Sequence, residues 1–228
     1  MAPSKTIFLE VAHCIKYQAG PCFLEADGIV IHQIQILDSK FFAPGAVGGG
    51  AKDILPDQYI DCVVYGCTSG TIAAGYNSIE QKVKAAKPMA NVTTPSSAAI
   101  NALKKLNIKK ISLFTPYPKK LNDEVLEYFK SEGFEITSNS YFDIAADYDI
   151  GKVDQNYLYD VLSKIDLNGA EALFVSCTAL PVLQIIDKLE KKLNTIVLSS
   201  NQTLIWDTLV KIKKNNSVKG FGKLFQHI

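Results

Sequence analysis

The segment DCVVYGCTSGT, Asp61 to Thr71, contains an apolar run that ends at a cysteine surrounded by glycines and hydroxyl side chains. A similar segment, EALFVSCTALP, spans Glu171 to Pro181. Each has a short run rich in β-branched or aromatic residues, then a Cys-Thr pair, then apolar residues at helical spacing. Such short continuous runs are typical of strands that are covered on both faces of a parallel sheet.

Strand and helix patterns alternate along most of the chain. We predict a strand that opens at Thr6 and further strands at Ile29–Leu37, Cys62–Tyr65, Ile111–Phe114, Ala172–Val175 and Thr195–Leu198. The predicted helical faces contain Ile72, Ile79 and Val83; Ala99, Leu103 and Leu106; Leu121, Val125 and Phe129; Val182, Ile186, Leu189 and Leu193; and Ile205, Leu209 and Ile212. This alternation predicts an α/β fold with parallel sheets.

The chain also repeats itself at a larger scale. VTTPSSAAINAL follows the first Cys-Thr segment, and VLSSNQTLIWDTL follows the second. The agreement of the cysteine turns, the hydroxyl pairs and their spacing indicates a repeat rather than a chance likeness. We therefore predict two similar Rossmann-like halves, related by a pseudo-twofold axis, with an active site in the cleft between them.

Composition and charge exclude several classes of protein. The 228 residues carry 24 basic and 23 acidic side chains, a net charge of +1, and no basic stripe with interleaved aromatics, so we expect no nucleic-acid partner. No apolar run approaches the roughly 18 residues of a membrane span, and the N-terminus does not resemble a signal peptide. Five cysteines without a CxxC pair fit reduced thiols. We expect a cytoplasmic protein.

The two cysteine turns carry the predicted chemistry. Cys67 and Cys177 both follow a strand and precede a predicted helix, where free N–H groups and the helix dipole favour a thiolate. The same N–H groups, with the hydroxyls of Thr68, Ser69 and Thr178, can bind a substrate carboxylate. Two thiols that face one carbon can exchange its proton. Alternatively, one thiol adds to an activated double bond while the other supplies a proton.

Other kinds of site lack the residues they need. The histidines show no pairing with either cysteine, no zinc-ligand spacing occurs, and no lysine follows the glycine as in a P-loop. We predict no metal and no cofactor. Cys62, which lies within an apolar run, is interpreted as a small buried core residue.

At these residues the chain resembles the aspartate/glutamate racemase superfamily, in the branch of maleate cis–trans isomerases and arylmalonate decarboxylases. The resemblance runs from about residue 26 to the C-terminus. It rests jointly on GCTSGT, VTTPSSAAINAL, LFTPYPKKLN, FVSCTALP and SSNQTLIWDTL.

The resemblance implies a role for each site residue. Cys67 matches the isomerase nucleophile that attacks the maleate double bond, and Cys177 matches the proton donor and acceptor. Thr68, Ser69 and Tyr117 match the group that holds a substrate carboxylate. The decarboxylases lack the first cysteine, so the presence of both favours a cofactor-independent isomerase of a small dicarboxylic acid, maleate to fumarate.

The resemblance also implies an organisation. The last helix, about Asn201 to Ile212, is expected to cross back to the first half. The halves would then be residues 1–95 with 201–228, and residues 96–200. Relatives of this kind are commonly dimers or larger assemblies, so we expect a homo-oligomer that binds a small carboxylic acid.

The chain departs from the family pattern at two places. The turn after the first strand lacks the asparagine that binds the second carboxylate in relatives, and Asp147 replaces a second asparagine. Two alternatives to the isomerase therefore stay open. One is an amino-acid racemase, of the aspartate/glutamate type, that uses the same thiols as two bases. The other is a degenerate, non-catalytic member that binds a small acid.

Overall fold

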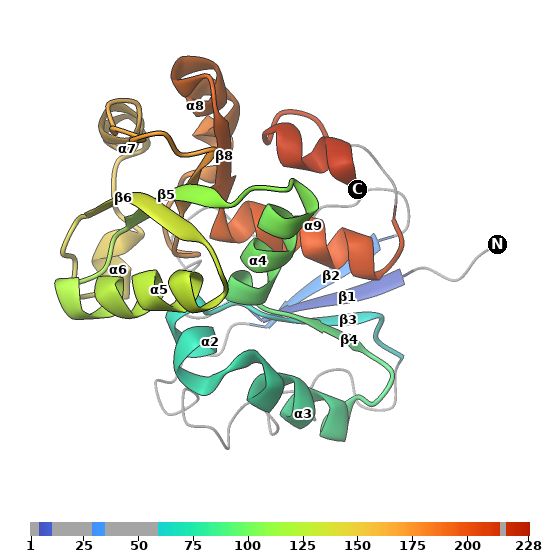
Figure 1. Ribbon diagram of the computed structural model, residues 1–228. Helices are drawn as coiled ribbons and strands as arrows, with labels where there is room; N and C mark the ends of the chain where they lie inside the picture. Colours follow the sequence, from blue (N-terminus) through green and yellow to red (C-terminus); the bar gives the residue numbers. More distant parts are fainter. Residues whose placement is uncertain (1–4, 11–28, 35–58, 215–217) are drawn as a thin grey trace.

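Two parallel β-sheets with the same strand order form the frame of the molecule. The computed structural model describes residues 5–10, 29–34, 59–214 and 218–228 (Figure 1). The first sheet has the order β2-β1-β3-β4, from β1 (Lys5–Glu10), β2 (Ile29–Ile34), β3 (Cys62–Tyr65) and β4 (Asn91–Thr93). The second has the order β6-β5-β7-β8, from β5 (Lys110–Thr115), β6 (Glu135–Tyr141), β7 (Ala172–Val175) and β8 (Ile196–Ser199). This confirms the predicted α/β fold with two similar halves.

The two cysteine turns occupy equivalent places in the two sheets. β3 lies between β1 and β4, and β7 lies between β5 and β8, with every pairing parallel. Every residue of β3 and β7 is buried, as their continuous apolar runs predicted. Cys67 and Cys177 therefore follow central strands at the carboxyl edges of the sheets, where ligands of α/β proteins bind.

Helices connect the strands in both halves. They are α2 (Thr68–Ala74), α3 (Tyr76–Ala86), α4 (Pro95–Lys105), α5 (Lys119–Ser131), α6 (Asp147–Ile150), α7 (Gln155–Leu162), α8 (Ile186–Leu193) and α9 (Ser200–Lys211), with 3-10 turns at η3 (Leu183–Ile185) and η4 (Lys223–His227). The predicted stripe of Ile72, Ile79 and Val83 is split between α2 and α3, because Gly75 adopts a φ of 76°. A left-handed residue interrupts a helix, and glycine adopts that conformation at little cost.

The helix predicted from Val182 begins later than expected. Val182 precedes the 3-10 turn η3, and α8 starts only at Ile186. Pro181 disfavours helical geometry at Leu180, the residue before it, so no helix starts directly at the second cysteine turn.

α4 and α9 begin in the same way and pack against each other (Figure 1). Each follows the last strand of its sheet and starts with a capping box, Thr94 with Ser97 in α4 and Ser199 with Gln202 in α9. A capping box satisfies two free N–H groups of the first turn reciprocally. The repeated hydroxyl motifs of the sequence are therefore equivalent helix starts.

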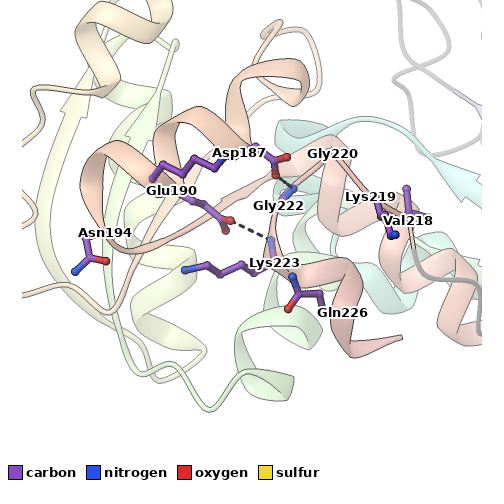
Figure 2. Close-up of a pocket in the computed structure, with 10 residues that line it drawn as sticks. Asp187, Glu190, Asn194, Val218, Lys219, Gly220, Gly222, Lys223 and Gln226 are labelled. Carbon is purple, nitrogen blue, oxygen red and sulfur yellow. Dashed lines mark hydrogen bonds between the residues drawn. The ribbon is translucent and has the colours of Figure 1, made fainter.

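Two carboxylates of α8, one of them buried, hold the C-terminal segment (Figure 2). Gly222 N–H donates to Asp187 Oδ1 (2.6 Å), and Lys223 N–H donates to Glu190 Oε2 (3.1 Å). Gly222 has a φ of 90°, and a Cβ there would lie 2.5 Å from Gln202 Nε2. Burial raises the pKa of Glu190, although its backbone donors oppose that shift. A pocket of about 680 Å³ lies at this junction, and none of the six predicted site residues lines it.

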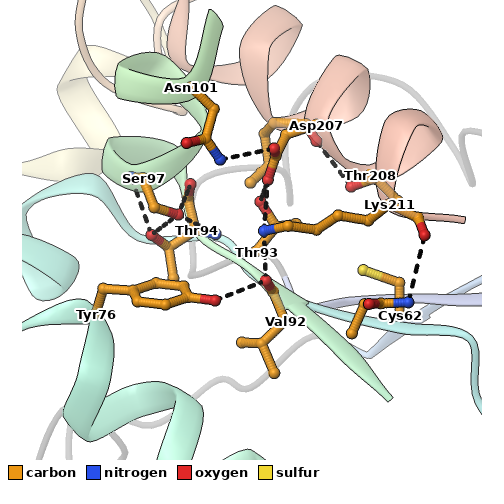
Figure 3. Close-up of polar contacts among 12 residues, drawn as sticks. Cys62, Tyr76, Val92, Thr93, Thr94, Ser97, Asn101, Asp207, Thr208 and Lys211 are labelled. Carbon is orange, nitrogen blue, oxygen red and sulfur yellow. Dashed lines mark hydrogen bonds and ion pairs between the residues drawn. The ribbon is translucent and has the colours of Figure 1, made fainter. Parts of the chain in front are cut away.

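A buried carboxylate anchors α9 to the first sheet (Figure 3). Asp207 is 2% exposed. It accepts hydrogen bonds from Thr93 Oγ1 of β4 and from Asn101 Nδ2 of α4 (2.9 Å), and it pairs with Lys211 Nζ (2.8 Å). Lys211 Nζ also donates to the carbonyl oxygen of Val92 (2.7 Å). α9 thus leaves the second sheet and contacts both β3 and β4 of the first.

The division into residues 1–95 with 201–228, and 96–200, stays a prediction. None of the helices in the described ranges is long and apolar enough to cross a membrane.

We predict that Lys211→Met lowers the free energy of unfolding by about 3 kcal/mol, because it leaves a buried carboxylate without its cation. Urea unfolding followed by the fluorescence of Trp206, the single tryptophan of the chain and a residue of α9, would measure the change. Lys119→Met is the matched control, since it breaks an exposed pair with Asp123 and should leave stability unchanged. Equal losses of unfolding free energy in Lys211→Met and Lys119→Met would contradict the anchoring role of the Asp207–Lys211 pair.

Candidate active site

Cys67 forms the start of α2 and is partly exposed. It is the N-cap residue, in extended geometry with a φ of −117°. Its Sγ accepts the N–H of Gly70 (3.2 Å) and lies 3.6 Å from Ser69 Oγ. A Cβ at position 70 would lie 2.5 Å from Tyr65 Oη and 3.0 Å from Cys67 Sγ. Glycine is therefore required there, because a side chain would displace the groups around the sulfur.

Cys177 occupies the equivalent turn in a different backbone conformation. It is 4% exposed and has a φ of 99°, a region that non-glycine residues rarely adopt. Holding it there costs about 1–3 kcal/mol, which the surrounding contacts must offset. Its N–H donates to Ser200 Oγ (3.0 Å), and its Sγ accepts the N–H of Ala179 (3.3 Å).

Tyr117 brings the two turns together. It lies just beyond β5, is 4% exposed, and lies beside the side chains of Cys177 and Thr68. Burial, together with both nearby cysteines, raises the pKa of its phenol well above the usual value. The phenol is therefore a neutral O–H donor at physiological pH, suited to an anionic oxygen that develops in a reaction.

Thr68 and Thr178 each reach across to the other half. Thr178 Oγ1 donates to the carbonyl oxygen of Gly66 (2.9 Å), and Thr68 Oγ1 donates to Ser200 Oγ (3.2 Å). Both hydroxyl protons are thus engaged within the protein. Cys67, Thr68, Tyr117 and Cys177 come together, with Ser69 beside the Cys67 sulfur, while Thr178 ties the turns to each other.

Three side chains from the starts of α4 and α9 also contact this site and were not predicted. Ser96 Oγ donates to the carbonyl of Thr68 (3.3 Å), and Asn201 Nδ2 donates to the carbonyl of Thr178 (2.9 Å). Ser200 Oγ contacts both turns. In the sequence, the hydroxyl motifs served only as evidence for the repeat and were assigned no contact with the site. Their repetition in step with the Cys-Thr pairs was the pattern that could have indicated these contacts.

The environment of the thiols corrects one expectation. Backbone donors contact both sulfurs as predicted, yet burial dominates and raises the pKa of Cys67, and that of Cys177 to about 12. The nearby Asp147 carboxylate adds to the rise at both cysteines. Burial likewise raises the pKa of Cys62, which is 0% exposed in the core, to about 12. The free protein thus holds its site thiols mainly in the protonated form.

The described residues include no group of three or more His, Cys, Asp or Glu side chains placed to hold a metal ion. The hydroxyl, phenol, N–H and thiol groups of the site are suited to carboxylates and to proton transfer. The absence of a cofactor stays an expectation. The asparagine-free turn after the first strand falls on residues 11–28, outside the described part of the chain.

We predict that iodoacetamide modifies Cys67 at least about tenfold faster than Cys62 or Cys177, because only Cys67 of these three is partly exposed. The Cys67 rate should still be rising at pH 9, since its pKa is raised from 9.0 and its thiolate remains the minor form below that pH. Peptide mass spectrometry measures each site.

Ser69→Ala is the variant that checks the cause of this reactivity. The Ser69 hydroxyl lowers the pKa of Cys67. Removing this hydroxyl should therefore raise that pKa and slow the labelling of Cys67 near neutral pH. Labelling of Cys177 as fast as that of Cys67, or a rate that levels off below pH 8, would contradict the assignment.

Several named proteins are similar to this chain in sequence. A maleate isomerase of Geobacillus stearothermophilus is 27% identical over 178 residues, which cover 75% of this chain and 71% of that protein. An arylmalonate decarboxylase of Bordetella bronchiseptica is 25% identical over 136 residues, 58% of this chain and 57% of that protein.

Solved structures extend the likeness of fold. A mutant of the Nocardia farcinica maleate cis-trans isomerase with a covalently bound succinylcysteine intermediate has a TM-score of 0.85 at 18% identity, covering 98% of this chain and 99% of that chain. Unliganded arylmalonate decarboxylase has a TM-score of 0.80 at 20% identity, covering 98% and 100%. The family model for arylmalonate decarboxylase matches residues 68–225. The chain therefore belongs to the arylmalonate decarboxylase family.

Proposed function

We propose that this protein is a cofactor-independent isomerase that converts maleate to fumarate, with Cys67 as nucleophile and Cys177 as acid and base. The observation that carries the proposal is the unequal setting of two cysteines at equivalent turns. Cys67 is partly exposed and accepts the Gly70 N–H, whereas Cys177 is buried against Tyr117. The similarity to maleate isomerases over three quarters of the chain supports it.

The first step is addition. Cys67 loses its proton to solvent, and its thiolate forms a bond to C2 of maleate while the double-bond electrons move toward C3 and its carboxylate. The Cys177 S–H then delivers a proton to C3. Because burial raises the pKa of Cys177 to about 12, this thiol holds a proton at neutral pH. Its setting fits the acid of this step.

The second step is rotation and elimination. The C2–C3 bond of the succinyl adduct is single, so its carboxylates can turn from cis to trans. The Cys177 thiolate removes a proton from C3, the double bond re-forms, and the Cys67 thiolate leaves. Fumarate departs, the Cys67 thiolate takes back a proton from solvent, and both thiols regain their starting forms. No oxidant, reductant or net proton is consumed.

Neutral donors would stabilise the charge that develops on the carboxylate next to C3. The Tyr117 phenol and the N–H groups of the Cys67 turn are the groups available for this. Losing one such donor typically raises a barrier by about 3–4 kcal/mol. We infer a soluble cytoplasmic enzyme that acts as a homo-oligomer on a small dicarboxylate.

Proton NMR of the protein with maleate in heavy water tests the function. We expect a growing fumarate signal that Cys67→Ala and Cys177→Ala each reduce by at least about 10³-fold, since each removes a group that forms or breaks a bond. Cys62→Ala is the matched control and should stay active, because Cys62 lies in the core at the start of β3, at the opposite end of that strand from the Cys67 turn.

Unchanged maleate with the wild-type protein would contradict the isomerase. Deuterium entering the α carbon of aspartate or glutamate would then indicate the racemase. No turnover of either kind, together with equal reactivity of the thiols, would favour a non-catalytic acid-binding protein.

A further inference from the structure

Ser200 joins the two cysteine turns through one oxygen atom. It is the first residue of α9 and is 0% exposed. Its Oγ accepts the N–H of Cys177 (3.0 Å) and the O–H of Thr68 (3.2 Å). Neither bond involves a sulfur atom, so Ser200 acts on the thiols only through the groups that carry them.

The Cys177 contact holds a backbone that would otherwise relax. Cys177 has a φ of 99°, a conformation that L-residues leave unless their surroundings fix it. The bond from its N–H to Ser200 fixes the peptide plane that precedes the residue, and with it the direction of the Cα–Cβ bond that carries Sγ. Only in that direction does Sγ meet the N–H of Ala179 and the phenol of Tyr117.

The Thr68 contact ties the first cysteine turn to the same oxygen atom. Thr68 Oγ1 donates to Ser200 Oγ, which also accepts the N–H of Cys177. Tyr117 lies beside the side chains of both Thr68 and Cys177. The proposed acid and a predicted carboxylate-binding residue are thereby held at fixed mutual positions, next to the phenol.

The start of α9 does not need this hydroxyl. Ser199 and Gln202 form the capping box of the helix, and Ser200 takes no part in it. A buried hydroxyl that accepts two bonds from outside its own helix, beside a strained cysteine, is therefore explained by the site rather than by the helix.

We propose that Ser200 is a positioning residue that fixes the Cys177 thiol and the Thr68 hydroxyl relative to each other. The kinetic part of this inference rests on the proposed isomerase activity. The structural part, anchoring of the Cys177 turn, does not.

Ser200→Ala tests the proposal, with Thr203→Val as the matched control. Thr203 lies in the same helix, is equally buried, and its hydroxyl donates only to the backbone carbonyls of Ser199 and Ser200. We expect Ser200→Ala to lower kcat by about 10²-fold, with a much smaller change in KM, because the reacting groups are misplaced rather than removed. NMR hydrogen exchange at the Cys177 amide should accelerate at least tenfold in Ser200→Ala and stay unchanged in Thr203→Val.

A wild-type kcat in Ser200→Ala or an unaltered hydrogen-exchange rate at the Cys177 amide would overturn the proposal. Equal losses of kcat in Ser200→Ala and Thr203→Val would also overturn it. If the wild-type protein leaves maleate unchanged, the proposed function fails. The hydrogen-exchange rate at the Cys177 amide then tests by itself whether Ser200 anchors the Cys177 turn.

Discussion

The site depends on the packing of α9 against the first sheet. Ser200 and Asn201, at the start of this helix, contact the backbone of the Cys177 turn. Two turns further along, Asp207 places a buried carboxylate among Thr93 of β4, Asn101 of α4 and Lys211 of its own helix. A buried charge is tolerated only when its partners are in place, so this anchor allows little displacement of the helix. The two cysteine turns lie close together because α9 is held at its start by the Cys177 turn and further along by the partners of Asp207.

Unequal environments at equivalent turns explain how one repeated motif could divide a reaction between two thiols. Cys67 starts α2 directly and lies in extended geometry, with the Gly70 N–H on its sulfur. After Cys177 the helix begins only at Ile186, and the cysteine adopts a positive φ in a fully packed surrounding. Burial favours the neutral thiol, whereas exposure and donors favour the thiolate. In the proposed mechanism, the same residue type therefore serves as proton carrier in one half and as nucleophile in the other.

Much of the fold could be predicted because its central strands are buried on both faces. β3 and β7 have the predicted bounds, since a continuous apolar run admits little ambiguity. β6 (Glu135–Tyr141) was not predicted because this edge strand is partly exposed and its residues are largely polar. β4 was missed because it has only three residues before a helix cap. The short helix α7 carries too few apolar residues at helical spacing to stand out.

The sequence predicted which residues form the site more fully than it predicted the pKa values of the thiols. The repeat and the family resemblance indicated Cys67, Cys177, Thr68 and Tyr117, which the fold brings together. The role of Ser200 depends on the contact between halves, which no local pattern contains. The direction of the thiol pKa shifts depends on how deeply each sulfur is buried, and local donors alone predicted the wrong sign.

The central claim is that Cys67 forms a bond to the substrate carbon while Cys177 delivers a proton to the neighbouring carbon and later removes one. The most direct measurement is the intact mass and peptide map of Cys177→Ser after incubation with maleate. Serine keeps a hydroxyl through which a proton can reach C3, but it does not readily ionise to the base that starts elimination. The adduct should therefore accumulate, and the account predicts an added mass of one maleic acid located on Cys67. Full conversion of maleate by this variant without any adduct, or an adduct located on another cysteine, would contradict it.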